Sequence, residues 1–433
     1  MYQFRDPIHG FIDVSEDELK IINSAPFQRL RYIRQLATTY LVYHGAEHTR
    51  FGHSLGVMHL TSRVFDSIME KKPLLFSNDE EENRKLCLWY RQILRLIGLT
   101  HDLGHAPFSH ASEELFEDNK QHEDYTKQIL FETEISGLIK EIGKNFQNEH
   151  GPKYEITPEL IWMIYEGKDF LNEKFIMPDF MFLHEFMDGE LDCDKMDYLL
   201  RDSYYCGVTY GKYDLNRFVS TLTAYKNTKE NVLKIAIERG GVQALEEFVL
   251  ARYFMFIQVY FHKTRRYLDK LLVQSLEKIL PTGKYPMALS EYLSWDDNKV
   301  LSKIASSRNK IVCEFKNRNV MSCVYESKPH SDKDSKKLIS AFYKSLKEKY
   351  KDKVFMDSVD KSAHKLLPSL YEYNDDTGKG IRICDPANGL STNIMDESPI
   401  LNSLVSSISI QRLYAKKEIS AGIKKKVAEF FKD

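Results

Sequence analysis

The chain of 433 residues lacks the cysteine pattern of a disulfide-stabilised domain or a zinc finger. It has six scattered cysteines and no C-x-x-C pair: Cys87, Cys193, Cys206, Cys313, Cys323 and Cys384. Scattered cysteines of this kind are typical of reduced thiols in a cytoplasmic protein. The N-terminal sequence MYQFRDPIHG also lacks the basic start and apolar run of a signal peptide. Both absences predict a cytoplasmic location.

The sequence has no strong charge of either sign and no long uninterrupted apolar run. Its formal net charge is -2, so no global field draws it toward nucleic acid or an anionic membrane. An anionic substrate must therefore be met by a local cluster of basic residues. The most apolar stretch, 245–261, contains two glutamates and an arginine, which indicates a buried helix rather than a membrane span. We expect no membrane partner, and the charge balance disfavours nucleic acid as a partner.

Apolar residues recur at helical spacing through the first 280 residues or so. Helices are predicted over 16–36, with a break near Pro26, and over 54–70 and 83–100. A chain of this length exceeds the usual size of one hydrophobic core, so we expect more than one lobe. The predicted fold is mainly α, with a helical domain over 1–285.

The character of the sequence changes after Pro281. Short β-rich pieces at 310–315 and 381–384 alternate with polar loops, and 375–380 (DDTGKG) predicts a hairpin turn. The polar run 327–337 is typical of a solvated loop or linker. These features predict a smaller C-terminal α+β lobe over residues 286–433.

The segment 97-IGLTHDLGHAPFSH-110 concentrates ionisable residues at the end of a predicted helix. An imidazole beside a carboxylate, as at His101 and Asp102, suits Mn, Fe, Mg or Zn. Neighbouring side chains on a helix diverge by about 100°, so a shared metal needs ligands from other helices. His53 upstream and Asp194 downstream are the candidates. Taken singly, these residues are equally compatible with hydrogen-bonded core histidines and a helix-capping aspartate, but burying so many ionisable groups is costly without a compensating ligand.

Five phrases occur in a fixed order along residues 4–265: DPIHGFI, FQRLRYIRQL, HTRFGHSLGV, HDLGHAPFSH and DCDKMDYLLRDS. Together they resemble the HD-domain deoxynucleoside triphosphate triphosphohydrolases, both the bacterial members and the vertebrate SAM-and-HD-domain enzyme. The resemblance implies an HD-domain helical core that cleaves a dNTP at its α-phosphate, giving deoxynucleoside and inorganic triphosphate. It implies one divalent metal ion (Mn, Mg, Fe, Ni or Zn) with four ligands: His53, His101, Asp102 and Asp194.

The same resemblance indicates residues that would protonate the leaving group. Histidine suits this task because its pKa lies near neutrality. His110, His122 and His105 are the candidates, and His110 is favoured because Glu113, three residues on, can orient it. His122 with its neighbour Glu123 also matches the family pattern, although a solvated loop position is an equally good interpretation.

Further family positions imply contacts to the substrate. Four residues match positions around the triphosphate: Arg50, Lys195, Tyr198 and Arg252. Gln35 and Asp202 match positions near the sugar 3′-hydroxyl. Leu36 and Tyr260 match positions against C2′, where apolar packing would leave a ribose 2′-hydroxyl buried and unpaired. The alternative for Arg252 and Tyr260 is a core role, because residues 248–263 form an aromatic-rich helical pattern.

The family resemblance also implies a homo-oligomer, with a tetramer favoured, and a possible nucleotide effector. Five residues match effector-contacting positions: Gln28, Arg31, Arg217, His262 and Lys263. The chain departs from the vertebrate pattern at Asn23, Tyr2 and Arg5, where that enzyme has an aspartate, a lysine and an asparagine. These departures argue against an effector site specific for guanine.

Two other functions are compatible with the sequence. The first is an HD phosphohydrolase of another nucleotide: a monophosphate, a cyclic nucleotide or a guanosine polyphosphate. The second is a nucleotide-sensing or single-strand nucleic-acid-binding module. The retained metal ligands argue against a sensor, and the cluster of cations argues against a monophosphate.

Overall fold

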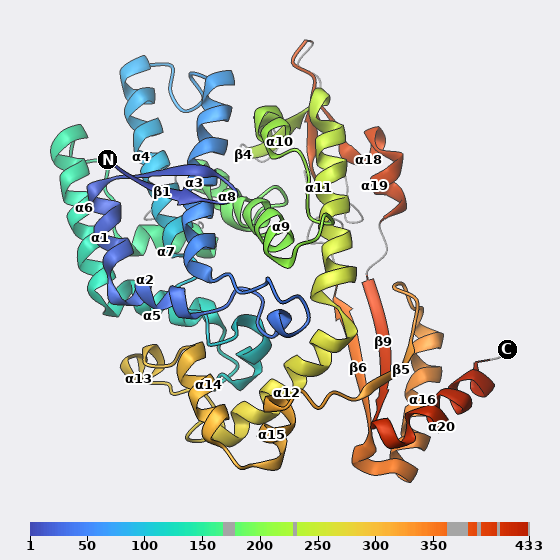
Figure 1. The fold of residues 1–433 in the computed structure, drawn as a ribbon. Coiled ribbons are helices and arrows are strands. Elements are labelled where there is room, and N and C mark those ends of the chain that lie inside the picture. Colours follow the sequence, from blue (N-terminus) through green and yellow to red (C-terminus); the bar gives the residue numbers. More distant parts are fainter. Residues whose placement is uncertain (168–177, 228–231, 362–379, 388–390, 405–407, 432–433) are drawn as a thin grey trace.

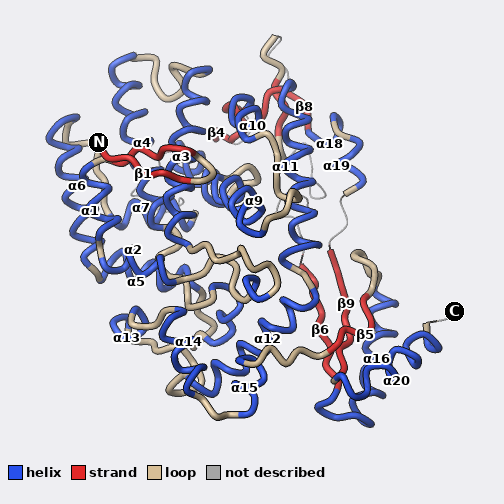
Figure 2. Tube along the Cα trace, viewed as in Figure 1, coloured by secondary structure: helices blue, strands red, loops and turns tan. Residues whose placement is uncertain are grey.

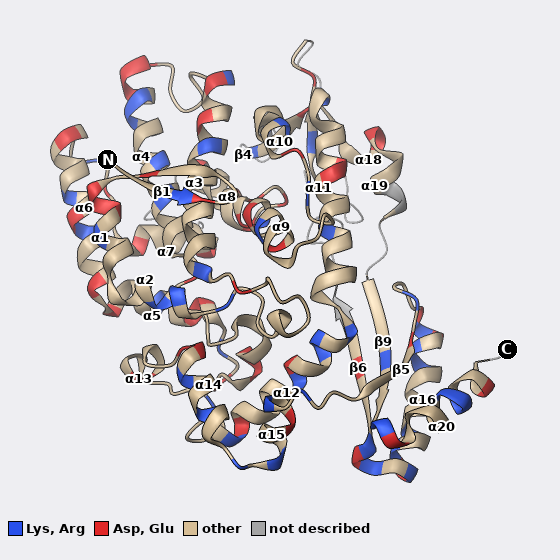
Figure 3. Ribbon diagram, in the orientation of Figure 1, with Lys and Arg blue, Asp and Glu red and all other residues tan. Residues whose placement is uncertain are grey.

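The computed structural model describes residues 1–167, 178–227, 232–361, 380–387, 391–404 and 408–431. The chain is mainly helical, as predicted, with small sheets toward the C-terminus (Figures 1 and 2). Basic and acidic side chains are interspersed over the helices (Figure 3), in keeping with the near-neutral balance of the sequence. Among the described residues, no helix is both long and apolar enough to cross a bilayer.

The N-terminus forms an antiparallel hairpin of β1 (Tyr2–Asp6) and β2 (Gly10–Val14). Ser15 then starts α1 (Glu16–Asn23) through a capping box with Glu18. The predicted break near Pro26 is confirmed, because the helix stops at Ser24 and Pro26 lies in the first turn of α2 (Ala25–Arg29).

Three helices at the centre carry most of the candidate ligands: α3 (Arg50–Lys71), α4 (Glu80–Thr100) and α9 (Cys193–Cys206) (Figure 1). Helices α3 and α4 cross closely, since a Cβ added at Gly98 would lie 3.0 Å from the Met58 Cα. Surrounding helices include α5 (His122–Glu132), α6 (Glu134–His150), α7 (Pro158–Glu166), α8 (Pro178–Asp188) and α10 (Leu215–Thr221). The helices predicted over 54–70 and 83–100 are confirmed and are a few residues longer than expected.

The predicted buried helix over 245–261 is also confirmed. It corresponds to α11 (Val242–Met255), which continues as a π-helical turn over Phe256–Tyr260. After a short break, α12 (Lys263–Ile279) leads into α13 (Leu289–Leu293), α14 (Asp297–Ser306) and α15 (Lys310–Lys316).

Two sheets lie among the later elements. The first has the order β3 (Leu222–Asn227), β4 (Val232–Glu238), β7 (Arg382–Cys384) and β8 (Ser391–Asn393), followed by α18 (Ile394–Glu397) and α19 (Pro399–Ser403). The second is antiparallel, with β9 (Ile408–Ala415) between β5 (Ser322–Glu326) and β6 (Val354–Lys361). Helices α16 (Lys333–Tyr350) and α20 (Lys417–Phe430) pack against this second sheet.

Two local predictions for the C-terminal part need correction. Residues 310–315, predicted to be β-rich, form α15, because Asn309 caps the helix and Val312 and Phe315 share its buried face. The polar run 327–337 is a loop only at its start, since Asp332 caps α16 and the helix begins at Lys333. The β-rich piece at 381–384 is confirmed as β7, whereas the predicted turn at 375–380 falls almost wholly outside the described residues.

Candidate active site

Three helix ends bring the four predicted metal ligands together. His53 lies in the first turn of α3, His101 and Asp102 follow the last turn of α4, and Asp194 lies in the first turn of α9. The His53 Nε2 atom is 2.9 Å from Asp194 Oδ1 and 3.6 Å from Asp102 Oδ2. The His101 Nε2 atom is 3.4 Å from Asp102 Oδ1 and 3.9 Å from Asp194 Oδ1. Two imidazole nitrogens and two carboxylates therefore surround one point.

The two imidazoles are held so that their Nε2 atoms face this point. His53 Nδ1 lies 2.8 Å from Asp197 Oδ2, and His101 Nδ1 lies 2.8 Å from the carbonyl oxygen of Gly98. Both Nε2 atoms are buried and have no hydrogen-bond partner. A buried polar atom without a partner is destabilising, and a bound cation would remove that cost. The nitrogen and carboxylate donor set suits a divalent first-row metal or Mg²⁺.

The electrostatics keep the carboxylates of this cluster ionised. Burial would raise the pKa of Asp102, but Arg50 at 2.5 Å, together with His101 and His105, holds it well below its usual range. Burial likewise opposes ionisation of Asp194, while the His53 ring lowers its pKa to about 2. Burial would lower the pKa of His53, but the adjacent carboxylates of Asp194 and Asp197 raise it to about 10.

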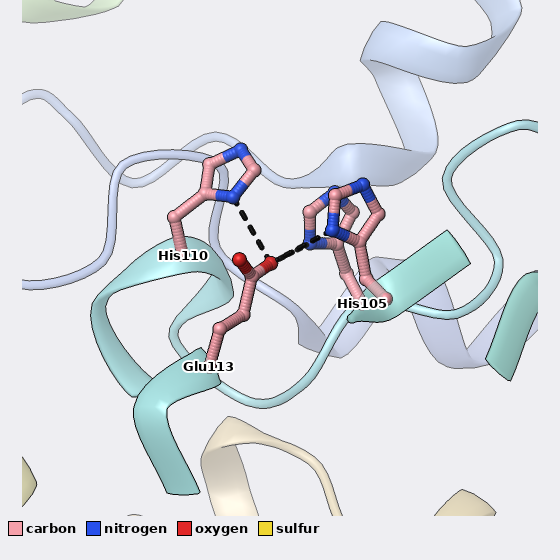
Figure 4. Close-up of side chains that lie close together, drawn as sticks. His105, His110 and Glu113 are labelled. Carbon is pink, nitrogen blue, oxygen red and sulfur yellow. Dashed lines mark ion pairs between the residues drawn. The ribbon is translucent and has the colours of Figure 1, made fainter. Parts of the chain in front are cut away.

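A second cluster of imidazoles surrounds Glu113 (Figure 4). The Glu113 Oε1 atom lies 2.9 Å from the Nδ1 of His122, 3.0 Å from that of His110 and 3.3 Å from that of His105. Burial would raise the pKa of Glu113, but His110, His105 and His122 hold it far below its ordinary value. The rings of His105 and His122 stack 3.7 Å apart. His105 also joins the two clusters, because its Nε2 lies 3.1 Å from Asp102 Oδ1.

The backbone that carries this second cluster is strained. Phe108 and Ser109 both have positive φ angles, 61° and 52°, which residues other than glycine rarely adopt. Asp297 at the start of α14 stabilises the turn by accepting the Phe108 N–H at 2.8 Å and the Arg34 N–H at 3.1 Å. Strained, over-determined segments of this kind are common at functional sites.

Both clusters border one cavity of about 1000 Å³. Most of the predicted site residues line it: Gln35, Leu36, Arg50, His101, Asp102, His105, His110, His122, Asp194, Tyr198, Asp202 and Tyr260. His53 is not among the described lining residues and is 1% exposed. Lys195 and Arg252 are not among the described lining residues. The Lys195 ammonium bonds Asp192 and the carbonyl oxygen of Gly189, and the Arg252 guanidinium lies 5.5 Å from the Phe256 ring centroid.

The end of the cavity away from Glu113 has its own hydrogen-bond network. Asp202 Oδ2 accepts the Tyr260 hydroxyl at 2.7 Å, and Asp202 Oδ1 lies 2.8 Å from His48 Nε2. The His48 ring stacks on Tyr205 with 4.6 Å between centroids. Leu36 and Tyr260 are both nearly buried here, and the Gln35 Oε1 atom is buried without a partner. One carboxylate and two apolar surfaces thus share this end of the cavity.

The predicted effector residues lie on several elements. Arg31 Nε donates to Gln28 Oε1 at 2.8 Å, and the Arg31 guanidinium lies 3.5 Å from the Phe51 ring centroid. Arg217 is exposed on α10, where it donates to the carbonyl oxygen of Gly240. His262 caps α12, and Lys263 begins that helix. Among the described residues, no hydrogen bond or ion pair joins Gln28 or Arg31 to the other three.

The residues at which the chain departs from the vertebrate pattern are near the N-terminus. Tyr2 and Arg5 lie on β1 and Asn23 ends α1. Tyr2 and Asn23 are exposed, and the Arg5 guanidinium lies 4.6 Å from the Phe11 ring centroid.

Several residues of this region were missed by sequence reasoning. Asp197 and His48 contact predicted site residues directly, and Asp297 holds the strained turn. The spacing of Asp197, three residues after Asp194 on one helix, could have indicated the first of these. Three cations of α12, Arg265, Arg266 and Lys270, also line the cavity, each paired with a carboxylate: Asp269, Asp357 and Glu114.

Comparison with known proteins identifies two family regions in the chain. Residues 50–174 match the HD domain family, and residues 213–337 match the HD associated region. The first match includes three of the four candidate metal ligands and all of the Glu113 cluster. The chain therefore contains an HD domain followed by an HD associated region.

Individual relatives point the same way. An uncharacterized protein of Bacillus subtilis, YwfO, is 34% identical over 64% of this chain and 55% of its own length. Human deoxynucleoside triphosphate triphosphohydrolase SAMHD1 is 29% identical over 76% of this chain and 56% of its own. A crystal structure of a hypothetical protein from Aquifex aeolicus is 29% identical, with a TM-score of 0.75 over 98% of this chain and 99% of that one. The chain thus spans about half of the length of the curated relatives it matches.

Proposed function

We propose that this HD-domain chain is a metal-dependent phosphohydrolase that cleaves deoxynucleoside triphosphates to deoxynucleoside and inorganic triphosphate. The observation that supports a hydrolase best is the convergence of two unpartnered imidazole nitrogens and two carboxylates beside the 1000 Å³ cavity. His53, His101, Asp102 and Asp194 would hold Mn, Mg, Fe, Ni or Zn. Such a cation supplies Lewis-acid activation of a water molecule and of a phosphoryl oxygen.

The histidines around Glu113 would donate the proton that the leaving O5′ atom requires. Glu113 Oε1 lies beside the Nδ1 atoms of His110 and His122, and both histidines line the cavity, so the Nε2 side of each ring is the side that would meet a substrate. Burial lowers the pKa of His122, but Glu113 more than compensates and raises it above the ordinary value. A protonated imidazole can donate to the departing oxygen. His110 is the favoured donor, since its side chain is 63% exposed and free to meet a substrate.

The remaining lining residues would bind phosphate and sugar. Arg50, held by Ser109 and Asp102, presents a cation beside the metal ligands. Asp202, anchored by Tyr260 and His48, would accept the sugar 3′-hydroxyl with Gln35. Leu36 and Tyr260 would pack against C2′ and disfavour a ribose. A phosphate role for Lys195 would require its ammonium group to leave Asp192, whereas the Arg252 Nε and Nη1 atoms are buried without a described hydrogen-bond partner.

The family resemblance and the named relative support a deoxynucleotide substrate. The family resemblance also favours a homo-oligomer, with a tetramer expected, and a possible nucleotide effector that would contact Gln28, Arg31, Arg217, His262 and Lys263. Light scattering with and without added nucleotides would measure the assembly.

The reaction itself is tested by product analysis. The purified chain would be incubated with each dNTP and each rNTP plus Mn²⁺ or Mg²⁺, and the products separated by ion exchange beside an Asp194→Ala control. We expect deoxynucleoside and intact triphosphate from dNTPs alone, and none from the control. Release of pyrophosphate or orthophosphate would contradict cleavage at the α-phosphate.

A second candidate is an HD phosphohydrolase of a nucleotide with fewer phosphates. It is favoured by one observation: Lys195 and Arg252 lie outside the described cavity lining, and the α12 cations are already paired. Nucleoside monophosphates and cyclic nucleotides in the same assay would distinguish this candidate by releasing orthophosphate or a monophosphate.

A further inference from the structure

The carboxylate of Asp197 is a buried hub between the candidate metal ligand His53 and the N-terminal hairpin. Asp197 is 0% exposed, and its Oδ2 atom lies 2.8 Å from His53 Nδ1. Its Oδ1 atom lies 2.7 Å from His9 Nε2, in the turn between β1 and β2. Arg201, one turn further along α9, donates to both oxygens at 2.7 and 2.9 Å. Four donor groups therefore converge on one carboxylate.

This arrangement determines how His53 can meet a cation. An ionised carboxylate only accepts hydrogen bonds, so the His53 nitrogen that faces Asp197 must carry its hydrogen. The lone pair available to a metal is then on Nε2, the atom that points at Asp102 and Asp194. A carboxylate behind a metal-binding imidazole fixes both the tautomer and the ring orientation.

Two glycines of α3 make room for the hub. A Cβ added at Gly56 would lie 1.9 Å from Asp197 Oδ1 and 2.6 Å from Arg201 Nη2. A Cβ at Gly52 would lie 3.2 Å from Arg201 Nη1. These glycines precede and follow His53 on the same helix, so the backbone around the ligand is shaped to admit the Asp197–Arg201 pair.

The turn between β1 and β2 contacts the Asp197–Arg201 pair from the side opposite His53. Asp6 Oδ2 accepts from Arg201 Nη1 at 2.9 Å, and Asp6 Oδ1 accepts the backbone N–H groups of Ile8 and His9 at 2.8 and 3.0 Å. The His9 side chain is completely buried against Asp197. Asp6 thus holds the turn in the shape that delivers His9 to the hub.

We propose that Asp197 is the positioning residue of metal ligand His53, and that the Asp6–His9 turn holds Asp197 in place. This inference rests on the proposed metal binding at His53. It makes the cation affinity of the site depend on a hairpin whose residues do not touch the cation.

The principal test compares Asp197→Asn with wild type by calorimetric titration of the full chain with Mn²⁺ alone. Loss of a carboxylate behind a metal-binding histidine typically weakens binding about 10- to 100-fold, and we expect an increase of that size in the Mn²⁺ Kd. Glu18→Gln is the matched control. Glu18 is also a buried carboxylate bonded to an arginine, Arg95, which holds β2 through the Asp13 carbonyl oxygen, but it does not contact the candidate ligands. Its Mn²⁺ Kd should equal that of wild type even if its Tm falls.

A second pair of variants covers the case in which Asp197→Asn does not fold. His9→Ala removes one donor from Asp197, whereas His9→Gln keeps an N–H donor at nearly the position of Nε2. We expect His9→Ala to weaken Mn²⁺ binding about fivefold, the effect of one hydrogen bond, and His9→Gln to restore most of it.

The outcomes separate the two levels of the proposal. If folded Asp197→Asn, or both His9 variants, bound Mn²⁺ with the same Kd as wild type, the positioning role would be overturned. The proposed function would still stand. A wild-type chain that binds none of Mn²⁺, Mg²⁺, Fe²⁺, Ni²⁺ and Zn²⁺ in the same titration would overturn both. An equal loss in Glu18→Gln would show that the effect is general destabilisation and would also overturn the inference.

Discussion

The two imidazole clusters of the cavity use the same residue types in opposite ways. Around Asp102, the Nδ1 atoms of His53 and His101 are engaged outward, by Asp197 and by the Gly98 carbonyl oxygen, and the Nε2 atoms are left without partners. Around Glu113, the Nδ1 atoms of three histidines turn inward onto one carboxylate oxygen. The first arrangement suits a cation, and the second suits protons held on imidazole rings.

The difference teaches that the second contact of each ring, rather than the count of histidines and carboxylates, indicates the chemistry of a cluster. Both clusters place enough nitrogen and oxygen atoms within 4.8 Å of one another to hold a metal. In the Asp102 cluster both imidazoles are held from behind in the manner of metal ligands, whereas in the Glu113 cluster His105 alone has such a contact, to Asp102. The following variants test that contrast.

The largest effect is expected from Asp102→Ala. This change removes a ligand and leaves Arg50, which lies 2.5 Å from Asp102, buried without its partner. We expect Mn²⁺ binding to be lost and hydrolysis to fall by at least about 10³-fold, since metal activation of water and phosphate would fail. Calorimetry and the product assay would measure both. Retained Mn²⁺ binding would show that Asp102 is not a ligand.

Glu113→Gln should break the other half of the contrast. Proton transfer by a positioned side chain contributes about 10²–10⁴-fold, so we expect kcat to fall within that range with Mn²⁺ affinity unchanged. Glu132→Gln is the control, because Glu132 is an exposed carboxylate at the opposite end of α5 from His122 and is not among the described residues that line the cavity. Weakened Mn²⁺ binding in Glu113→Gln would instead make the Glu113 cluster part of the metal site.

The pH dependence of the Glu113 cluster gives a finer test. Burial lowers the pKa of His122 but Glu113 raises it more, so the protonated ring persists to a higher pH than an ordinary histidine. Removing the Glu113 charge lowers that pKa, and the alkaline limb of kcat should move to lower pH in Glu113→Gln. Imidazole nitrogen NMR across pH 5–9 would report the titration of His122 directly. An unchanged pKa in the variant would contradict the role of Glu113 as the charge that sustains it.

The sequence predicted the Asp102 cluster better than the rest of the cavity, for a physical reason. His53, His101, Asp102 and Asp194 all lie at helix ends; apolar periodicity marks α3 and α4 in the sequence, and Asp192 caps α9. The order of the five sequence phrases, which resembles that of the HD-domain family, then indicated that these four residues form one site. The structure confirms the mainly helical fold and brings these four residues together, while their role as ligands stays a prediction.

Long-range and competing local contacts were beyond that reasoning. Asp297 lies far along the chain from the Phe108 N–H that it accepts, and nothing in either segment indicates the other. Lys195 was expected near phosphate, but Asp192 at the start of the same helix takes its ammonium group. The sequence shows Asp192 three residues before Lys195. That local pattern does not distinguish a lysine that pairs with a helix-capping aspartate from a lysine that binds phosphate. Likewise, the β-branched and apolar residues of 310–315 predicted a strand, whereas Asn309 caps this segment as a helix.

The smallest expected effect concerns the end of the cavity that neither cluster occupies. Tyr260→Phe removes the hydroxyl that donates to Asp202 Oδ2 at 2.7 Å and leaves the ring in place. A hydrogen bond to a charged group contributes about 1.5–3 kcal/mol, and Asp202 keeps its contact with His48, so we expect a loss near the lower value, about tenfold in kcat/KM for a dNTP. Tyr43→Phe is the control, because its hydroxyl donates to the Gln258 carbonyl oxygen outside the described cavity lining. A hydroxyl that only orients Asp202 should change substrate binding and leave both imidazole clusters as they are. A loss of Mn²⁺ affinity in Tyr260→Phe would therefore show that the Asp202 end of the cavity and the candidate metal ligands are not separate sites.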